Sequence, residues 1–584
     1  MNRSVPMNKA EDISRTWLED FAQLLTKTEN VEEGVTKTFL PDGWLRDLLI
    51  FTWDNRSLNG LRKIACYLQE NLPRSVISNI ELDHHSELAP KYLPLNDTLK
   101  CVCSGFKFST TVANGHGFFR LVEEGPGCWK AATVFIMADS LKGHEELGYE
   151  LGVYGGHTLS WTDVQAERRK SVEVDPYVLI IGGGQTGLNI GARFRQMKIP
   201  ALIIEQNNRI GDNWRKRYPT LTLHTPRSYS PMLYQPFPKN WPLYSPRDKI
   251  ADWLEQYASS QDLTAWTNAR AEPIPVYDSK AKRWSVTIIH DGTSIELHPV
   301  HIVVATGMLG IPRVPSPTDQ NIFKGVVFHA SKYEGGKLFS GKRAIIVGAG
   351  NTSADICQDL VFHGASSVTM IQRSSTCIVA SSTTRDDLLR GWPEGGSVDI
   401  ADLKAAAIPF LYLKKVLTEH AEEAIAKEKE LHDMLRKGGL NVSFGTGGSG
   451  CFPLVFEKAG NYWLDVGCAE LIGSGRVKVK HGVEIAKFIE DSVIFTDGTS
   501  LKADLVVFAT GYHTMHDGLK TLFGAEIMDQ TGPIWGVDEE GEARGCYRPS
   551  GHPGLWFGAG DFYYSRFYSK QLALIIKAIQ IGLV

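Results

Sequence analysis

The spacing of apolar residues changes twice along the chain. Up to residue 72 apolar side chains recur every three or four positions, which predicts amphipathic helices. From 77 to 138 they alternate with polar ones, which predicts strands, and beyond 177 the apolar runs are short and continuous, as in buried parallel strands. The helices are expected at 17–25, 44–53 and 61–72, and the alternating strands at 77–82, 100–108, 115–121 and 129–138.

This order of elements predicts an α/β protein with an additional N-terminal part. Helices followed by a curved sheet predict an α+β cone over 1–160, and the charged stretch Asp163–Lys170 predicts a linker or exposed helix over 161–176. Two buried strands that end at glycine repeat one phrase and are expected to form a hinge, where one domain is interrupted by another. These strands are 302–307 and 505–512, the interrupted domain is 177–335 with 486–584, and the inserted domain is 336–485.

A glycine-rich motif follows the first of the continuous apolar runs. Gly182 permits a tight turn, Gly184 lets the backbone approach a pyrophosphate, and Gly187 lets the next helix pack against the strand. The free N–H groups of that helix N-terminus favour a phosphate. The next run, 201–204, ends at Glu205, where a carboxylate accepts hydrogen bonds from a ribose diol. The motif predicts a Rossmann-like dinucleotide site; the alternative is a glycine-rich turn in an unrelated α/β protein.

A second motif keeps two of the three glycines. Gly348 and Gly350 have the same offsets, but Ser353 replaces the third glycine. The next apolar run, 367–371, is followed by Arg373 rather than by an acid. Because a carboxylate repels a 2′-phosphate and an arginine pairs with it, this motif predicts NADPH over NADH. The alternative is a surface arginine on a solvated loop.

Composition narrows the classes of function. Of the 584 residues 43% are hydrophobic and 22% are charged, which is ordinary for a globular protein. The formal net charge of −4 gives no reason to expect nucleic acid or an anionic membrane as partner. The nine cysteines lack regular spacing and are expected to be reduced thiols. The sequence contains no GxSxG or HExxH, and we expect neither a hydrolytic triad nor a metal.

Nothing in the sequence indicates a membrane protein. The first residues lead to no apolar core, so no signal peptide is expected. No stretch reaches the ~18 apolar residues that span a bilayer. The apolar run 572–584 is short and contains Lys577, which predicts a docked core helix. We therefore expect a cytoplasmic protein.

A third phrase lies between the two glycine motifs. Residues 323–333, FKGVVFHASKY, fit the pattern FxGxxxHxxxY and resemble the signature of flavin-containing (class B) monooxygenases. The resemblance covers about residues 170–584 and extends to GDNWR at 211–215 and GAGD at 558–561. LTLHTP at 221–226 and PFPKNWP at 236–242 are similar to the YUCCA-type plant enzymes, which decarboxylate indole-3-pyruvate to an auxin.

The N-terminal part resembles another fold. Residues 42–72 are similar to the SnoaL-like (nuclear-transport-factor-two-like) domains that precede the flavin domain in some fungal monooxygenases. Such cones are enzymes, lids or dimerisation units, and a homodimer through this part is one expectation. Five polar residues are candidates to line a cone, with packing and surface positions as the alternative: Asp47, Asp54, His84, His85 and His116.

The monooxygenase resemblance implies FAD at the first motif and NADPH at the second. NADPH reduces the flavin in that family, and the reduced flavin adds O₂ to give a C4a-(hydro)peroxyflavin that oxygenates a small organic substrate. Typical Baeyer–Villiger relatives end the signature with tryptophan followed by Pro or Asp, whereas this chain has Tyr333-Glu334. N- or S-oxygenation, or oxidative decarboxylation of a 2-oxo acid, is therefore expected.

The same resemblance implies roles for single residues. His329 is expected in the hinge and in a hydrogen-bond network between the cofactor domains. His224 and Thr225 match the segment that lies near the oxygen-reacting edge of the flavin. The residues expected to bind the two cofactors are Gly182, Gly184, Gln185, Thr186, Gly187, Glu205, Gln206, Trp214, Gly307, Gly348, Gly350, Asn351, Thr352, Ser353, Arg373, Ser374, Thr510, Gly511 and Asp561.

Three other functions stay open at this point. The first is a Baeyer–Villiger monooxygenase, and the second is an NADPH oxidase or flavin reductase with two dinucleotide sites. A disulfide reductase of that second group needs a redox cysteine pair, and no CxxC or CxxxxC occurs after residue 103. The third is a bifunctional chain whose N-terminal cone is a cyclase or isomerase.

Overall fold

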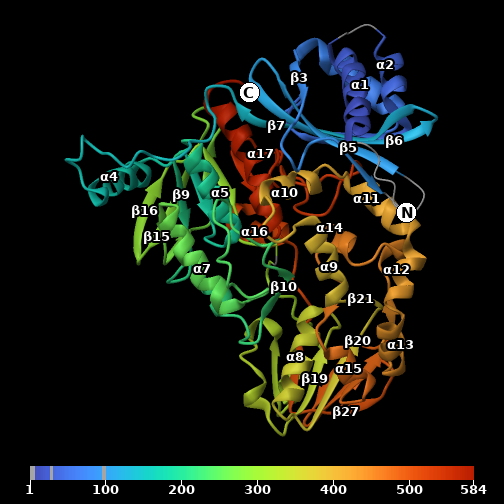
Figure 1. Ribbon diagram of the computed structural model, residues 1–584. Coiled ribbons are helices and arrows are strands. Elements are labelled where there is room, and N and C mark those ends of the chain that lie inside the picture. The colour runs from blue at the N-terminus through green and yellow to red at the C-terminus, as the bar shows by residue number, and fades with distance from the viewer. Residues whose placement is uncertain (1–6, 27–29, 95–99, 309) are drawn as a thin grey trace.

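A computed structural model describes residues 7–26, 30–94, 100–308 and 310–584. The chain forms three units, each built around one large sheet (Figure 1). The N-terminal unit, residues 7–141, lies above the other two in this view. The helix α17 (Phe562–Gln580) packs against β7 of that unit on one side and against α5 of the first parallel sheet on the other. None of the helices formed by the described residues has the length and hydropathy of a membrane span.

The N-terminal unit packs three helices against a mostly antiparallel sheet of order β2-β1-β7-β6-β5-β3, with β4 paired to β5. Aromatic rings fill its interior. The ring centroid of Trp17, for example, lies 5.0 Å from that of Phe21 and 4.6 Å from that of Phe119. The elements are α1 (Met7–Thr26), α2 (Val31–Thr38), β1 (Phe39–Leu48), β2 (Asn55–Asn59), α3 (Leu61–Asn71), β3 (Ser78–Leu82), β4 (Lys91–Pro94), β5 (Lys100–Ser109), β6 (Ala113–Gly125) and β7 (Cys128–Leu141).

The helix predicted over 44–53 is wrong, because the second half of strand β1 lies in this segment. All side chains from Trp44 to Leu48 are buried, so the strand shows no alternation of apolar and polar residues. Arg46 and Asp47 are buried on opposite faces of the sheet, since successive side chains of a strand point to opposite sides. Because protein covers both faces of this strand, its apolar residues do not alternate with polar ones, and their spacing resembled that of a helix. The other two predicted helices and the four predicted strands are present in the structure.

Of the five polar residues proposed to line a cone, Asp47, Asp54 and His116 bind other protein groups, whereas His84 and His85 are exposed. The Asp47 carboxylate accepts hydrogen bonds from the backbone N–H groups of Ile50 and Phe51 and from the Tyr67 hydroxyl at 2.7 Å. Burial raises the pKa of Asp47 to about 6. His116 lies 2.7 Å from the Asp83 carboxylate. These contacts agree with a packed structural unit.

The first parallel sheet has the order β12-β9-β8-β17-β29, and all its neighbours are parallel. This order places the loop after β8 at the point where the connections change direction, which is where open α/β sheets bind ligands. The helices α4 (Trp161–Val174), α5 (Gln185–Gln196), α6 (Asp212–Arg215) and α7 (Arg247–Ser260) belong to this unit, with β8 (Val178–Ile181), β9 (Ala201–Ile204), β12 (Ala265–Trp266), β17 (His301–Val304) and β29 (Leu555–Phe557).

Two smaller strand groups extend this unit, and a third lies on the second parallel sheet. A four-stranded antiparallel group precedes β17, and a two-stranded group follows α6. Their members are β13 (Ala269–Ala271), β14 (Val276–Asp278), β15 (Arg283–His290) and β16 (Thr293–Leu297), then β10 (Thr222–Pro226) and β11 (Tyr244–Pro246). The third group, β25 (Ile485–Ile489), β26 (Ser492–Phe495) and β27 (Ser500–Lys502), packs against the second sheet, where Phe488 contacts Phe323.

The second parallel sheet has the order β18-β28-β19-β20-β24. The two repeated phrases of the sequence are the equivalent strands β17 and β28, since each pairs with the strand that precedes a glycine motif. The strands are β18 (Val326–His329), β19 (Arg343–Val347), β20 (Ser367–Gln372), β24 (Val477–His481) and β28 (Leu505–Phe508), with α8 (Asn351–Phe362) and α15 (Cys468–Gly473). Two of these strands, β18 and β28, lie outside 336–485, and the predicted domain boundaries stay a prediction.

A helical segment after β20 returns toward the N-terminal unit (Figure 1). It begins directly after β21 (Thr376–Ala380), which pairs with the later strands β22 (Val442–Ser443) and β23 (Tyr462–Asp465). Its helices are α9 (Ser381–Gly391), α10 (Val398–Ala406), α11 (Phe410–Glu419), α12 (Ala421–Lys427), α13 (Lys429–Lys437) and α14 (Phe452–Lys458), and α16 (Met515–Met528) follows β28. The helix α10 reaches α17 and the N-terminal sheet.

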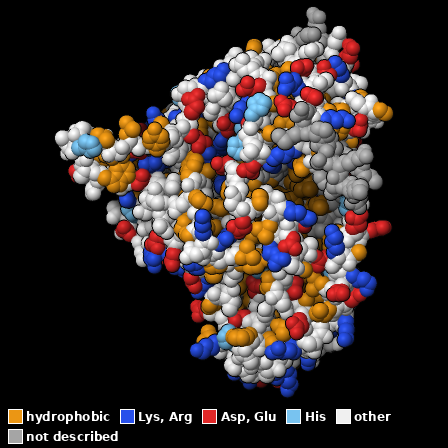
Figure 2. All heavy atoms as spheres, viewed as in Figure 1, with side chains coloured by type: hydrophobic (Ala, Val, Ile, Leu, Met, Phe, Trp, Pro, Cys, Tyr) orange, Lys and Arg blue, Asp and Glu red, His pale blue; other side chains and the backbone are white. Residues whose placement is uncertain are grey.

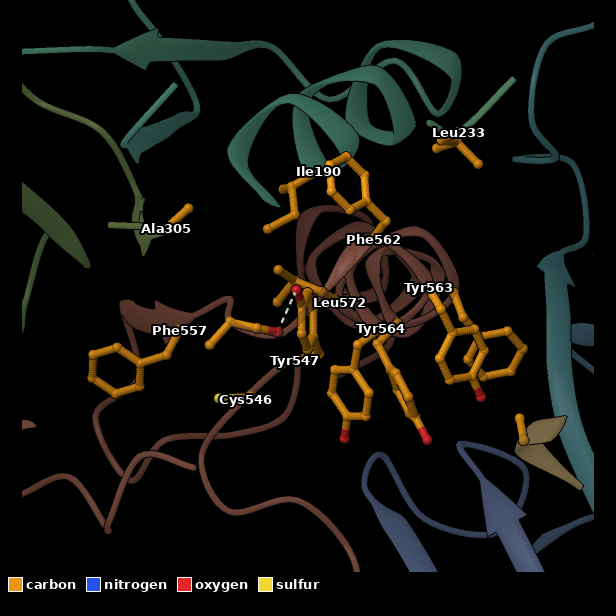
Figure 3. Packing of buried hydrophobic residues seen from close by; sticks show 14 of the residues in the cluster. Ile190, Leu233, Ala305, Cys546, Tyr547, Phe557, Phe562, Tyr563, Tyr564 and Leu572 are labelled. Atoms are coloured by element: carbon orange, nitrogen blue, oxygen red, sulfur yellow. Dashed lines mark hydrogen bonds between the residues drawn. The ribbon is translucent and has the colours of Figure 1, made fainter. Parts of the chain in front are cut away.

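The apolar C-terminal run is a docked helix, as predicted. Most of α17 is buried, and its first turns carry an aromatic cluster beside α5 (Figure 3). Tyr547 donates a hydrogen bond to the carbonyl oxygen of Ala559 at 3.0 Å within this cluster. The packing fixes the loop before α17, which contains Asp561.

Candidate functional site

The first glycine loop is closed around its own backbone. Gly182 has a φ of +115°, and a Cβ there would lie 2.5 Å from the carbonyl oxygen of Ala305. A Cβ on Gly187 would lie 1.9 Å from the carbonyl oxygen of Gly182. Gly184 differs: it precedes α5 in extended conformation, and a Cβ there would meet nothing closer than Asn213 Nδ2 at 3.4 Å. Protein atoms therefore require Gly182 and Gly187, whereas the space at Gly184 is free for a ligand.

Glu205 lies at the end of β9 and turns toward this loop. Its Oε2 accepts a hydrogen bond from the N–H of Gly183 at 3.0 Å, and its Oε1 accepts one from the N–H of Asn207 at 2.8 Å. The residue is 7% exposed. Gln185 and Thr186 form the first turn of α5, and Gln206 is exposed beside Glu205. These residues surround one cradle, with free helix N–H groups and a carboxylate at its edge.

Two further predicted residues extend the cradle toward α17. Trp214 in α6 is buried, and among the described residues its Nε1 has no hydrogen-bond partner. Asp561 accepts a hydrogen bond from the N–H of Tyr564 through Oδ1 and one from the Tyr229 hydroxyl through Oδ2 at 2.5 Å. Burial raises the pKa of Asp561. A buried donor without a partner among the described residues and a half-buried carboxylate fit an extended polar ligand.

The second glycine loop repeats the geometry of the first. Gly348 has a φ of +127°, and a Cβ there would lie 2.3 Å from the carbonyl oxygen of Ala509. Gly350 precedes α8 in extended conformation, and the atom nearest to its Cβ would be the carbonyl oxygen of Tyr462 at 3.8 Å. Ser353 is fully buried, and its Oγ has no hydrogen-bond partner among the described residues. The loop thus forms a second cradle with an open space at its middle glycine.

The remaining residues of this motif lie as follows. Asn351 and Thr352 are in the first turn of α8, and Asn351 Oδ1 accepts a hydrogen bond from the N–H of Leu464 at 2.9 Å. This contact leaves the Asn351 Nδ2 group for other acceptors. Arg373 follows β20, is exposed and lies 3.2 Å from Glu484, and the next residue, Ser374, is also exposed. A ligand phosphate would compete with the Glu484 carboxylate for Arg373.

His329 lies at the end of β18 and bonds to the segment after β28, where the sequence predicts a hinge. Its Nδ1 accepts a hydrogen bond from the N–H of Ser331 at 3.1 Å, so its Nε2 carries the proton and donates to the carbonyl oxygen of Gly511 at 3.0 Å. The same carbonyl accepts a hydrogen bond from the N–H of Arg313, which follows β17 and Gly307. The Thr510 hydroxyl donates to the carbonyl oxygen of Arg313. Burial lowers the pKa of His329, which favours this neutral form.

The signature segment is flanked by two surface hollows. One, of about 400 Å³, includes His329 and Ser331 in its wall, and the other, of about 540 Å³, includes Ser331 to Glu334 and Arg217. They lie where strands of the second sheet meet segments of the first unit. The junction between the two parallel sheets is therefore incompletely packed.

The segment with His224 and Thr225 faces the second unit. Thr225 Oγ1 lies 2.8 Å from Ser230 Oγ. The Tyr218 hydroxyl donates to the carboxylate of Asp355 in α8 at 2.6 Å. Burial raises the pKa of Asp355, and the charge of His224 opposes that rise. A segment of the first unit thus contacts the helix that begins at the second cradle.

Several residues of this region were missed in the sequence. Tyr229 is joined by a hydrogen bond to Asp561, a predicted site residue, whereas Tyr218 and Asp355 are joined to each other. Asp355 is one turn beyond the second glycine motif, so its position on the helix was a usable signal. Tyr229 carries no motif, because its contact with Asp561 joins residues more than 300 positions apart.

Comparisons with known proteins agree with this geometry. The chain matches the Flavin-binding monooxygenase-like family over residues 178–521. It is 28% identical to the probable indole-3-pyruvate monooxygenase YUCCA9 of Arabidopsis thaliana, over 68% of this chain and 85% of that protein. It is 30% identical to the indole-3-pyruvate monooxygenase YUCCA8 of Oryza sativa subsp. japonica, over 58% of this chain and 76% of that protein.

Solved structures show the same fold. A crystal structure of cyclohexanone monooxygenase with ε-caprolactone has a TM-score of 0.51 at 16% identity, over 70% of this chain and 88% of that one. At this identity the likeness shows the mixed α/β fold alone. The family match covers more than half of the chain and includes both glycine loops and the signature between them. The chain therefore belongs to the flavin-binding monooxygenase-like family, and it is an oxidoreductase.

Proposed function

We propose that this protein is an FAD-dependent, NADPH-consuming monooxygenase, with FAD in the first cradle and NADPH in the second. The contact of Tyr218 with Asp355 carries the proposal. It joins the segment that follows Trp214 to the helix of the second glycine loop, so the two cradles serve one junction. Two unrelated nucleotide sites would not need this contact.

The residues of the first cradle fit FAD. The open space at Gly184 takes the pyrophosphate, and the Glu205 carboxylate accepts from the ribose. Trp214 Nε1, which has no partner among the described residues, is a donor along the cofactor. When bound, the flavin supplies the oxygen chemistry that the side chains of this chain lack. Asp561 and Tyr229 hold the polar end of this cradle, and the ring cluster of α17 excludes water behind it.

The residues of the second cradle fit NADPH. The first N–H groups of α8, from Asn351 onward, are donors for its phosphates. Arg373 pairs with the 2′-phosphate in place of Glu484. His329 holds the predicted hinge together, because it bonds to the same Gly511 carbonyl as Arg313 of the segment after β17. In its neutral form His329 places no charge next to the cofactor.

Arg373→Ala is expected to lower the NADPH over NADH preference by about tenfold, because one exposed charge-assisted contact contributes about 1.4 kcal/mol. The measurement is kcat/KM for each nucleotide. Arg436→Ala, at an exposed arginine of α13, is the matched control and is expected to leave the preference unchanged. An unchanged preference in the Arg373 variant would refute the assignment of the 2′-phosphate.

The substrate class is proposed from two observations. The relatives of printed function act on indole-3-pyruvate, a 2-oxo acid. The signature ends at Tyr333, whose hydroxyl donates to Asp359 at 2.7 Å, where Baeyer–Villiger enzymes carry tryptophan. We infer N- or S-oxygenation of a small molecule or oxidative decarboxylation of a 2-oxo acid, with Baeyer–Villiger oxidation as the alternative.

Turnover with ¹⁸O₂ tests this proposal. The protein is given NADPH with a tertiary amine, a sulfide, an aryl 2-oxo acid or a cyclic ketone, and the products are weighed by mass spectrometry. One ¹⁸O atom in an N-oxide, a sulfoxide or the carboxylate left after loss of CO₂ supports the proposal. A labelled lactone supports the Baeyer–Villiger alternative. Stoichiometric H₂O₂ with every compound supports an NADPH oxidase and contradicts monooxygenation.

The N-terminal unit is proposed to be a SnoaL-like cone without catalytic function. Its aromatic core is filled, since a Cβ on Gly115 or Gly117 would lie 2.1–2.3 Å from the rings of Phe108 and Phe106. A substrate site in this cone would need these rings to move. We propose a homodimer through this unit. The filled interior disfavours a cyclase or isomerase function.

A further inference from the structure

Two arginines of the N-terminal sheet, among other contacts, join it to the segment around α10. Arg46 in β1 donates through Nε and Nη2 to the carboxylate of Glu542 at 2.7 Å each, and through Nη2 to the Tyr568 hydroxyl at 2.8 Å. Its Nη1 donates to the carbonyl oxygen of Ala406. Both side chains of the Arg46–Glu542 pair are at most 7% exposed. A fully buried ion pair of this kind ties a strand to one geometry.

The second arginine binds the same helix end. Arg120 in β6 donates to the carbonyl oxygen of Ala407 at 2.9 Å and to that of Lys404 at 3.1 Å. These carbonyls and that of Ala406 form the C-terminal end of α10. Carbonyls there have no partner within the helix, and the helix dipole favours a cation. The N-terminal sheet therefore supplies the C-terminal cap of a helix that belongs to a distant segment.

Another side chain of α10 binds α17, the helix that packs against α5 of the first cradle. Asp402 accepts two hydrogen bonds from Arg566 of α17, at 2.7 and 2.8 Å, and both side chains are at most 3% exposed. Asp402 also accepts from Trp392 Nε1 at 2.7 Å. Arg566 in turn donates to the carbonyl oxygens of Tyr229 and Pro231.

This network ends at the proposed flavin cradle. The ring of Trp392 lies 4.7 Å from that of Tyr229 and 5.2 Å from that of Tyr563. The Tyr229 hydroxyl donates to Asp561. Contacts thus run without a gap from the N-terminal sheet through α10 to the carboxylate before α17.

We propose that Arg120 and Arg46 are positioning residues for the flavin-side site, and that the N-terminal unit acts by fixing α10 over Tyr229 and Asp561. The inference rests on the proposed function, because it takes Asp561 as part of the FAD cradle. A nine-residue helix is too short to be stable alone, so α10 depends on its caps and its packing. The N-terminal unit is therefore a constant part of the reaction site without contributing a reacting group.

Arg120→Met is the variant that tests this inference, because Arg120 is half-buried and forms no ion pair with any residue that the structure describes. Arg62→Met, at an exposed arginine of α3, is the matched control. Loss of the charged hydrogen bonds to the helix end is expected to speed hydrogen exchange in α10 about tenfold. Exchange in 226–234, which includes Tyr229, is expected to rise with it, and the visible circular dichroism of the flavin is expected to change. Arg120→Lys keeps one carbonyl contact and should raise the exchange rates by an intermediate amount. It also tests the inference if the methionine variant does not fold.

The outcomes separate this inference from the proposed function. Faster exchange confined to 398–407, with 226–234 and the flavin signal unchanged, would overturn the positioning role. An equal effect of Arg62→Met would do the same. Absence of flavin from the wild-type protein would refute the proposed function, whereas coupling of exchange between α10 and 226–234 is measured without any cofactor.

Discussion

Gly184→Val is expected to give a folded protein that binds FAD at least 100-fold more weakly. Gly184 has an extended backbone that valine adopts readily, and its Cβ would meet no protein atom closer than 3.4 Å. The side chain would fill the space assigned to the pyrophosphate instead. A 100-fold loss corresponds to about 2.7 kcal/mol, which is modest for steric exclusion of a phosphate from its cradle. The measurement is the flavin absorbance of the purified protein, with its thermal unfolding followed in parallel.

Unfolding separates the loss of a ligand from the loss of the fold. Circular dichroism in the far ultraviolet should match wild type, and the apoproteins should differ in stability by no more than about 1 kcal/mol. Gly187→Val is the opposite case, since its Cβ would lie 1.9 Å from a backbone oxygen, and it should not fold. A Gly184→Val protein with full flavin content would place FAD elsewhere.

Gly350→Val is expected to keep FAD and to slow flavin reduction by NADPH roughly 100-fold at a fixed nucleotide concentration. Gly350 is also extended, and the atom nearest to its Cβ would be the carbonyl oxygen of Tyr462 at 3.8 Å, which is an ordinary van der Waals contact. The valine would occupy the second cradle and leave the first untouched. The measurement is anaerobic reduction of the bound flavin, followed by its absorbance.

Dithionite supplies the control for this variant. It reduces the flavin without a nucleotide site, so its reaction should proceed in Gly350→Val as in wild type. Gly184→Val then loses bound flavin, whereas Gly350→Val keeps its flavin and loses reduction of that flavin by NADPH. Normal reduction by NADPH in Gly350→Val, or loss of flavin from it, would reverse the order of the two sites.

The sequence predicted the parts of the site that depend on local geometry. Gly182, Gly187 and Gly348 are required by contacts with the strand or helix next to them, and such requirements leave a motif. Glu205 and Arg373 follow strands directly, so their positions at the sheet edge could be read from the apolar runs. The family match over 178–521 confirms what these motifs indicated about the class of enzyme.

Contacts between distant segments could not be predicted in this way. The contact between Arg46 and Glu542 joins residues 496 positions apart, and that of Asp402 with Arg566 joins residues 164 apart. Neither leaves a spacing in the chain. The strand β1 was missed for a related reason, because burial of Arg46 by α10 and α17 covers the face that a half-exposed strand leaves polar.

The most direct test of the account is stopped-flow mixing of the NADPH-reduced protein with O₂ while NADP⁺ is still present. Two cradles at one junction predict that the bound nucleotide shields the reduced flavin site from water. We expect an absorbing state that differs from both reduced and oxidised flavin and that persists when no substrate is added. Direct return of the oxidised spectrum in one phase, with stoichiometric H₂O₂, would contradict a monooxygenase and identify an oxidase.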